Sequence, residues 1–249
     1  MKRSLRAVLL VLCGLGLLRV SLLTDLCLRY VKESMRPMLI VSGAVLVLLG
    51  AASAVLDRRA GADLRNQDDG HDGHGHDHSG LPRVAWLLLL PALSLLFHAP
   101  PALGAYTASR QPAKPVARQS DFGPLPAVSP LPMTLSDFTS RVQQDRERAI
   151  SGRTVLMTGI VTPREGGWDL TRIVISCCAA DAQSVKVRVY GGTVPSADSW
   201  VTVTGTWHPG GTLGTASAPV ALDVQTVKKV PRPVNGYQDA LPLPSTLTR

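Results

Sequence analysis

The sequence contains few aromatic residues and few cysteines. Aromatic side chains make up 4% of the chain, too small a share for the stacking platforms on which proteins bind single-stranded nucleic acids. Of the four cysteines, Cys13 and Cys27 lie in or beside the first apolar stretch, whereas Cys177 and Cys178 are neighbours in the polar half. This arrangement excludes a conventional disulfide framework. We interpret Cys13 and Cys27 as small packing residues.

Positive charge is also scarcer in the polar half than the net charge of +8 suggests. Residues 135–249 contain 12 Lys and Arg against 9 Asp and Glu, which leaves a net charge of +3. The remaining +5 lies in residues 1–134, where basic residues flank apolar stretches and can anchor them against anionic lipid headgroups. We therefore expect no nucleic-acid partner, and a lipid bilayer around the N-terminal part.

Three apolar stretches dominate residues 1–106. They cover residues 7–28, 38–56 and 84–104. Because a hydrocarbon core of about 30 Å requires about 20 apolar residues in a helix, we predict about three transmembrane helices. The first stretch contains Arg19, whose side chain can reach the interface. No small-residue cleavage site follows it, so we predict an uncleaved span instead of a signal peptide.

The basic residues favour one orientation in the membrane by a narrow margin. Seven Lys and Arg lie on the side of the N-terminus and the second loop, and six lie on the opposite side. Under the positive-inside rule, the pair Arg58 and Arg59 favours a cytoplasmic second loop. The C-terminal domain is then expected outside the cytoplasm.

The second loop, residues 57–83, is rich in histidine. Four of the six histidines fall within eight residues and are interleaved with Asp and Gly, namely His71, His74, His76 and His78. Neutral imidazole and carboxylate suit divalent Zn, Ni, Co or Cu, and this composition is typical of a metal-collecting tract. No fixed ligand spacing is present. The alternative is a solvated loop in which His and Asp only maintain polarity.

A proline-rich segment, residues 107–134, predicts an extended spacer between the helical region and a second domain. Thr134, followed three residues later by Asp137, predicts a helix N-cap. Apolar residues at helical spacing continue this short helix towards Ser151 and Gly152.

Five short strands follow the helix. They are predicted at residues 155–161, 170–175, 185–189, 201–207 and 221–227. Gly159 and Gly205 interrupt strand patterns and suit the bends that curl a small barrel. The predicted fold is therefore an α-helical membrane region followed by a small all-β barrel domain over residues 135–233, with a tail at 234–249.

The loop after the second strand contains Cys177, Cys178 and, three positions later, Asp181. The two thiols could hold a metal such as zinc, helped by Asp181 or His208. They could form a strained vicinal disulfide, or one could act as a nucleophile, although no histidine lies nearby in sequence. In the remaining interpretation both are small residues in a turn that Asp181 caps. Beside a thiolate, Asp181 would raise the thiol pKa and slow redox chemistry, which favours metal over redox.

Five strings in this sequence are distinctive. They are Gly-Arg-Thr-Val at 152–155, Gly-Ile-Val at 159–161, the segment 172–182 ending in Cys-Cys-Ala-Ala-Asp-Ala, Trp-Val-Thr-Val-Thr-Gly at 200–205, and Pro-Pro-Ala-Leu-Gly-Ala at 100–105. Together they resemble the YcgQ-like (DUF1980) family of bacterial membrane proteins. The histidine-rich loop belongs to the same resemblance. The Cys-Cys-Ala-Ala-Asp-Ala string is its most specific part.

The resemblance implies an accessory subunit of a two-component membrane permease with an OB-like C-terminal domain. The implied partner is a YcgR-like (DUF318) multi-span permease in the bacterial cell membrane. Three spans with few polar groups do not easily form a solute path alone, which agrees with a helper role and with no enzymatic activity. The alternative is a membrane-anchored metal-handling or thiol-redox protein that uses the histidine loop and the cysteine pair.

Overall fold

The computed structural model describes residues 2–63, 103–233 and 236–241, which divide into two compact units. The first unit includes residues 1–28 and 33–102, and the second includes residues 29–32 and 103–249. The predicted third span at 84–104 lies almost wholly outside the described residues, as does the histidine-rich part of the second loop.

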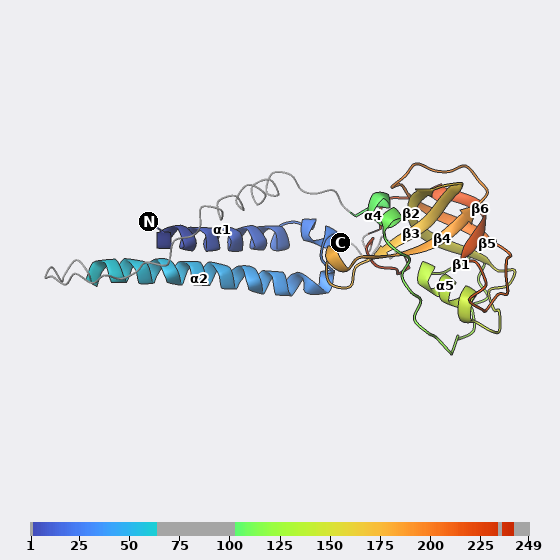
Figure 1. The fold of residues 1–249 in the computed structure, drawn as a ribbon, viewed down its shortest axis with the longest axis horizontal. Coiled ribbons are helices and arrows are strands. Elements are labelled where there is room, and N and C mark those ends of the chain that lie inside the picture. The colour runs from blue at the N-terminus through green and yellow to red at the C-terminus, as the bar shows by residue number, and fades with distance from the viewer. Residues whose placement is uncertain (1, 64–102, 234–235, 242–249) are drawn as a thin grey trace. The chain divides into compact units, whose positions relative to one another are not determined.

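The first unit is a pair of helices joined by a short irregular turn (Figure 1). Its elements are α1 (Lys2–Leu22), the 3-10 helices Leu26–Arg29 and Glu33–Met35, and α2 (Arg36–Asp63). The first predicted span, 7–28, is therefore wrong at its C-terminal end, because α1 stops at Leu22. Arg36 explains this end, since its Nε donates to the carbonyl oxygen of Ser21 at 2.6 Å and satisfies a free helix-terminal acceptor.

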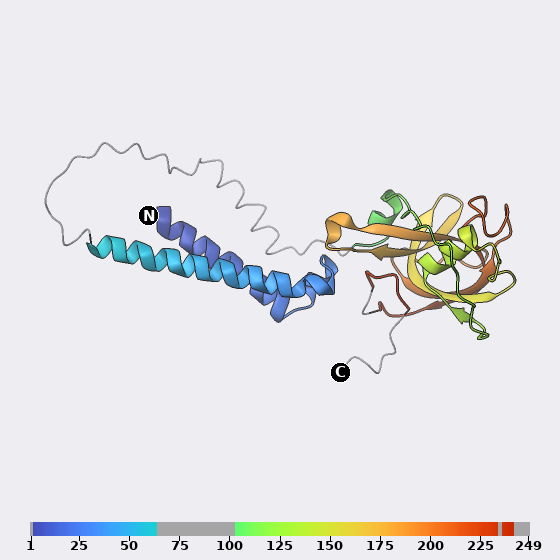
Figure 2. The same cartoon turned by 90° about the horizontal axis from the view of Figure 1, so that it is seen from below.

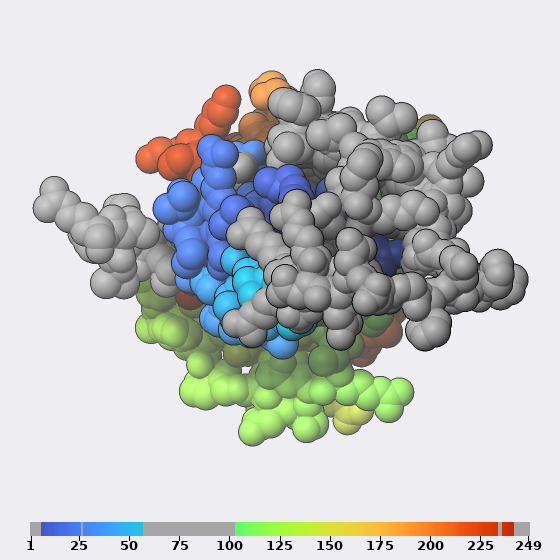
Figure 3. Space-filling model, turned by 90° about the vertical axis from the view of Figure 1, so that its left-hand side faces the viewer, coloured from blue at the N-terminus to red at the C-terminus, as the bar shows by residue number. Residues whose placement is uncertain are grey.

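Helices α1 and α2 lie against each other (Figures 1 and 2), and their dark-blue and lighter-blue to cyan atoms adjoin in Figure 3. Glycines allow this close approach. A Cβ added to Gly14 would lie 2.7 Å from the carbonyl oxygen of Gly43, and one added to Gly50 would lie 2.9 Å from that of Ala7. Gly16, by contrast, has open space around it. The helix contact thus uses small residues that permit close backbone approach, as in membrane helix pairs. Cys27 is buried, as expected of a packing residue, whereas Cys13 is exposed on α1 within the described residues.

Among the described residues, one stretch, Glu33–Leu56, is long and apolar enough to cross a membrane by length and composition. Its most apolar 18-residue window has a mean hydropathy of 2.5, and 11% of that window is buried within the protein. A signal sequence near an N-terminus can have the same length and composition, whereas the core helix of a soluble protein would be mostly buried. This helix contains the second predicted span, residues 38–56.

The second unit is built on a six-stranded mixed sheet that nearly closes into a ring (Figures 1 and 2). The strands are β1 (Leu131–Pro132), β2 (Thr154–Arg164), β3 (Gly167–Val174), β4 (Gln183–Tyr190), β5 (Trp200–Trp207) and β6 (Ala221–Lys229). Their order is β1-β2-β3-β4-β6-β5, and β2 also pairs with β5. The five predicted strands are confirmed, and β1 is a short addition that pairs in parallel with β2.

The predicted glycine bends lie where two backbones approach closely. A Cβ on Gly159 of β2 would lie 2.7 Å from the carbonyl oxygen of Thr171 on β3. Gly205 of β5 lies beside a register shift in its pairing with β6, and there a Cβ would meet the carbonyl oxygen of Asp223. Both positions therefore require glycine for space, as expected where a sheet bends sharply.

A short helix, α5 (Leu135–Gln144), covers the ring and contributes Leu135, Phe138 and Val142 to the main apolar core. The amide of Asp137 donates to Oγ1 of Thr134 at 3.0 Å, which confirms the predicted N-cap. The prediction that the helix continues towards Ser151 and Gly152 is wrong. Asp145 ends it, because its carboxylate accepts the amides of Glu147 and Ala149 and turns the chain.

The compact unit extends beyond residues 135–233 at both ends. Helix α4 (Ala105–Arg110) contributes Ala108 to a second apolar cluster with Ile160, Ile173, Ile175 and Tyr237. Within the proline-rich segment, the amide of Lys114 donates to the carbonyl oxygen of Ser184 on β4. The residues expected as a spacer and as a tail therefore include parts that pack on the sheet.

The C-terminal segment is held by a buried ion pair. Arg172 on β3 and Asp239 have exposed side-chain fractions of 1% and 5%, and Nε of Arg172 lies 4.0 Å from Oδ1 of Asp239. The same carboxylate accepts the amides of Leu135 and Ser136 at the start of α5. Burial lowers the pKa of Arg172, and Asp239 opposes this shift. One carboxylate thus joins the C-terminal segment, β3 and α5.

Replacing Asp239 with Ala should destabilise the second unit by about 3–5 kcal/mol, because a buried arginine is left without its counter-ion. Chemical denaturation of the full chain in detergent, followed by tryptophan fluorescence, measures the effect. Three of the four tryptophans, Trp168, Trp200 and Trp207, report on this unit. Asp121→Ala, an exposed control, should change stability by about 0.5 kcal/mol or less. Equal stability of the two variants would contradict the assignment.

Candidate functional site

The two adjacent cysteines lie at the tip of a two-stranded arm formed by β3 and β4 (Figure 2). The strands pair as far as Val174 and Gln183, and the loop between them contains a single 3-10 turn, Ala179–Asp181. The sulfur atoms of Cys177 and Cys178 lie 3.7 Å apart. Cys177 is exposed and Cys178 is partly exposed, so solutes can reach both sulfurs.

The carboxylate of Asp181 organises this loop. Its Oδ1 accepts the amide of Ser176 at 3.0 Å, and its Oδ2 accepts the amide of Cys177 at 2.7 Å. Such bonds from a short acidic side chain to nearby amides stabilise a tight turn. Asp181 therefore caps the loop, as one of the interpretations from the sequence proposed.

The same carboxylate controls the acidity of the neighbouring thiol. A hydrogen bond to Asp181, and then one to Cys178, raises the pKa of Cys177 from 9.0 to about 11. The hydrogen bond from Cys177 also lowers the pKa of Asp181. The expectation that Asp181 raises the thiol pKa is confirmed in direction. At neutral pH Cys177 is therefore a protonated thiol, which makes it a poor nucleophile.

A second segment of the same unit fixes the loop from outside. Residues 29–32 lie against it, with an antiparallel bridge between Val31 and Cys178. The amide of Lys32 donates to the carbonyl oxygen of Cys177 at 3.1 Å, and the amide of Ala179 donates to that of Tyr30 at 2.6 Å. Sequence reasoning missed this contact. Two or three residues that pair across a separation of almost 150 positions leave no periodic pattern to detect.

The other candidate ligands are not brought to the cysteine pair. His71, His74, His76 and His78 lie outside the described residues. His208, a candidate helper, has its Nδ1 at 2.6 Å from Oδ1 of Asp223 and stacks on the ring of Tyr190 at 4.1 Å. Within the described part of the chain, no three His, Cys, Asp or Glu side chains lie so that they could hold a metal ion.

His208 and Asp223 belong to a polar surface cluster at the ends of β4 and β5. Arg188 completes it by donating from Nη1 to the hydroxyl of Tyr190 at 3.1 Å. Nearby on β3, burial raises the pKa of Asp169, while Arg164, Arg188 and Lys186 lower it. The cluster offers a base and an aromatic surface.

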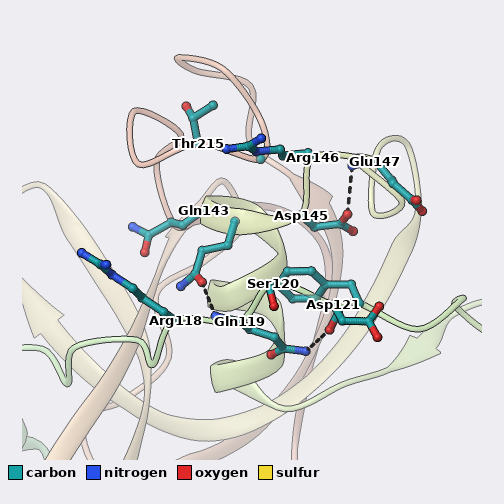
Figure 4. A pocket seen from close by; sticks show the side chains of 12 residues that line it. Arg118, Gln119, Ser120, Asp121, Gln143, Asp145, Arg146, Glu147 and Thr215 are labelled. Atoms are coloured by element: carbon teal, nitrogen blue, oxygen red, sulfur yellow. Dashed lines mark hydrogen bonds between the residues drawn. The ribbon is translucent and has the colours of Figure 1, made fainter.

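A pocket of about 830 Å³ lies beside the C-terminal end of α5 (Figure 4). The chain at 118–122 forms one wall, and the amide of Gln119 donates to Oε1 of Gln144 at 2.7 Å. Its charged residues are Arg118, Asp121, Arg146 and Glu147, besides Asp145, which caps the turn. Charges of both signs line an open, polar surface, and no set of them converges on one point.

Residues 139–238 match the model of the DUF1980 C-terminal domain. This part of the chain is a DUF1980 C-terminal domain. The match covers β2–β6 and includes the cysteine loop, which confirms the resemblance for the C-terminal half. No curated protein and no solved structure is matched. The cysteine loop is therefore part of the recognised domain and not of an insertion.

Replacing Asp181 with Asn should lower the pKa of Cys177 from about 11 towards 9.0, because the negative charge beside the thiol is removed. Since the folded-state pKa lies above the ordinary value, protonated Cys177 stabilises the loop below pH 9, and this contribution is lost as the pH rises through about 11. Alkylation rates of the Cys177 peptide, measured by mass spectrometry against pH, give the midpoint.

Asp223→Asn is the control for this measurement, since that carboxylate pairs with His208 and should leave the Cys177 midpoint unchanged. A midpoint near 9 in the unmodified protein, or no shift in the Asp181 variant, would contradict the role assigned to Asp181.

Proposed function

We propose that the chain is an accessory subunit of a bacterial membrane permease, anchored by its helix pair and presenting the DUF1980 C-terminal domain outside the lipid. The observation that carries this proposal is the apolar outer surface of α1 and α2. Large apolar side chains on these two helices are left uncovered by the rest of the chain. For example, the exposed fraction is 59% for Leu12 and 68% for Leu48. Exposed apolar surface of this extent requires lipid or a protein partner.

The length of the apolar stretch in α2 supports a lipid bilayer as the environment of the helix pair. At 1.5 Å per residue, the 24 residues of Glu33–Leu56 span about 36 Å, which exceeds a hydrocarbon core of about 30 Å. We propose that this stretch is one span of a multi-pass anchor of about three spans, as expected from the apolar stretches of the sequence. Exposed side chains run along α2 from Met38 to Leu56, so lipid can surround the pair wherever a partner does not.

The glycine contact between the helices favours a role in assembly. Close packing through Gly14, Gly43 and Gly50 leaves the bulky apolar side chains on the outside, available for another membrane protein. A pair of helices without charged groups in its centre provides no path for a polar solute. The resemblance adds the kind of partner, a YcgR-like (DUF318) multi-span permease.

The strand order supports an OB-like fold for the domain. A ring in which β2 pairs with β3 and β5, β3 with β4, and β4 in parallel with β6 corresponds to a five-stranded, partly open barrel. Barrels of this kind bind ligands on one face and through the loops between strands. We therefore assign the domain a binding role beside a transporter.

The proposal places residues 107–249 outside the cytoplasm, as the Arg58–Arg59 pair favours. A cysteine introduced at the exposed Ser196 should react with a membrane-impermeant thiol reagent in intact cells. The background for this test lacks all four native cysteines. Reaction only after lysis would place the domain in the cytoplasm.

The partnership is tested by co-expressing the tagged chain with the DUF318 permease of the same genome and purifying in mild detergent. The permease should be recovered with the unmodified chain and with Gly16→Leu, because Gly16 has open space around it. Gly14→Leu should reduce recovery at least tenfold, since overpacking costs about 1–3 kcal/mol and separates the helices.

Membrane insertion of each variant, checked by resistance to alkaline extraction, shows that loss of the permease is not loss of the chain. If the unmodified chain recovers no permease, the proposed partnership is wrong. If Gly14→Leu recovers as much permease as Gly16→Leu, the helix pair is not the docking element.

A further inference from the structure

We propose that Cys177 and Cys178 bind a divalent metal ion of the zinc type through both sulfur atoms, with the remaining coordination positions open. This inference does not rest on the permease role, because metal binding by the loop can be measured without any partner. It makes the cysteine loop a metal-capture site on the DUF1980 C-terminal domain.

The separation of the sulfur atoms favours a bent, tetrahedral arrangement. With metal–sulfur bonds of about 2.3 Å, as in zinc sites, a sulfur–sulfur distance of 3.7 Å gives an S–metal–S angle of about 107°. This value is close to the tetrahedral angle that zinc prefers. A linear ion such as Cu(I) would need the same two sulfurs at about 4.6 Å with bonds of that length. The observed spacing is therefore suited to a tetrahedral ion.

The same geometry argues against a disulfide between these residues. Neighbouring Cα atoms across a trans peptide bond are about 3.8 Å apart, whereas disulfides normally join Cα atoms about 4.4–6.8 Å apart. Of the two chemistries open to the pair, metal binding needs less rearrangement of the loop.

The loop is already ordered for this purpose. The two amide bonds to Asp181 fix residues 176 and 177, and the bridge to Val31 fixes Cys178 from the other side. A metal ion thus meets two positioned sulfurs and does not have to order a flexible chain, which lowers the entropic cost of binding.

Asp181 is assigned as a positioning residue and not as a ligand. Both of its oxygens accept amide hydrogen bonds, and coordination to the ion would break at least one of them. Its charge nevertheless favours a cation beside Cys177. Binding converts two thiols and one free ion into a metal dithiolate and releases two protons, so the affinity rises with pH.

Two thiolates leave two positions of a tetrahedral ion for water or for a donor from another molecule. Structural zinc sites are closed by four protein ligands, whereas sites that exchange or activate ligands keep a position open. The exposed tip of the β3–β4 arm makes these positions accessible. We therefore assign the site to exchange of a metal ion with the surroundings and not to stabilisation of the fold.

The experiment uses the full chain in detergent with a phosphine reductant, and Co²⁺ as the spectroscopic probe. Because the histidine-rich loop can also bind Co²⁺, His71, His74, His76 and His78 are replaced by Asn in every sample. We expect one equivalent of Co²⁺ to produce a thiolate-to-cobalt charge-transfer band. Zn²⁺ should remove the band by displacement.

The band should disappear in Cys177→Ser and in Cys178→Ser, and persist in the control Cys13→Ser/Cys27→Ser. Tryptophan fluorescence establishes that each serine variant is folded. Asp181→Asn keeps both thiols, and should shift the onset of binding to lower pH while weakening it at alkaline pH by about 10–100-fold. A purely structural role of Asp181 would not shift the onset. Absence of the band in the parent, or a band that survives in both serine variants, would overturn the proposal.

Discussion

Pairing between β2 and β5 is the constraint on which the second unit depends. Without it the six strands would form an open sheet with two free edges. The contact extends over seven residue pairs, from Thr154 opposite Thr206 to Ile160 opposite Trp200. It bends the sheet back on itself, and the bend is feasible because Gly159 and Gly205 let neighbouring backbones approach. The side chains inside the ring then form the main apolar core, which includes Phe138, Trp168 and Leu222.

Two carboxylates attach distant parts of the chain to this ring. Asp239 holds the C-terminal segment against Arg172 and the start of α5, and it does so inside the protein, where an unpaired charge is costly. Asp181 works at the surface, where its bonds to two amides shape the cysteine loop. The first carboxylate serves stability. The second sets the position and acidity of a thiol, and so affects chemistry more than folding.

The helix pair and the domain divide the proposed work between them. Small residues bring α1 and α2 together and leave apolar side chains outside, which suits a membrane partner. The domain offers an accessible pair of sulfurs at the tip of an arm. Residues 29–32 follow α1 in sequence yet belong to the second unit, where they pair with the cysteine loop.

The sequence alone determined the features that depend on local pattern. Runs of β-branched residues predicted the positions of five strands. Thr134 and Asp137 predicted the start of α5. The apolar run at 38–56 predicted the central part of α2. The Cys-Cys-Ala-Ala-Asp-Ala string identified the DUF1980 C-terminal domain before any geometry was known. Each of these signals lies within about a dozen neighbouring residues, so it is readable without knowledge of the fold.

Only the tertiary structure decided the ends of α1 and α5, the two extensions of the domain, and the surroundings of the cysteines. Arg36 ends α1 by bonding Ser21 across the turn, and Asp239 reaches α5 from more than 100 residues away. Likewise, whether Asp181 faces a metal or the backbone depends on how the loop folds over itself. These contacts join side chains to backbone groups that are distant in sequence, and no periodicity records which distant groups a fold brings together.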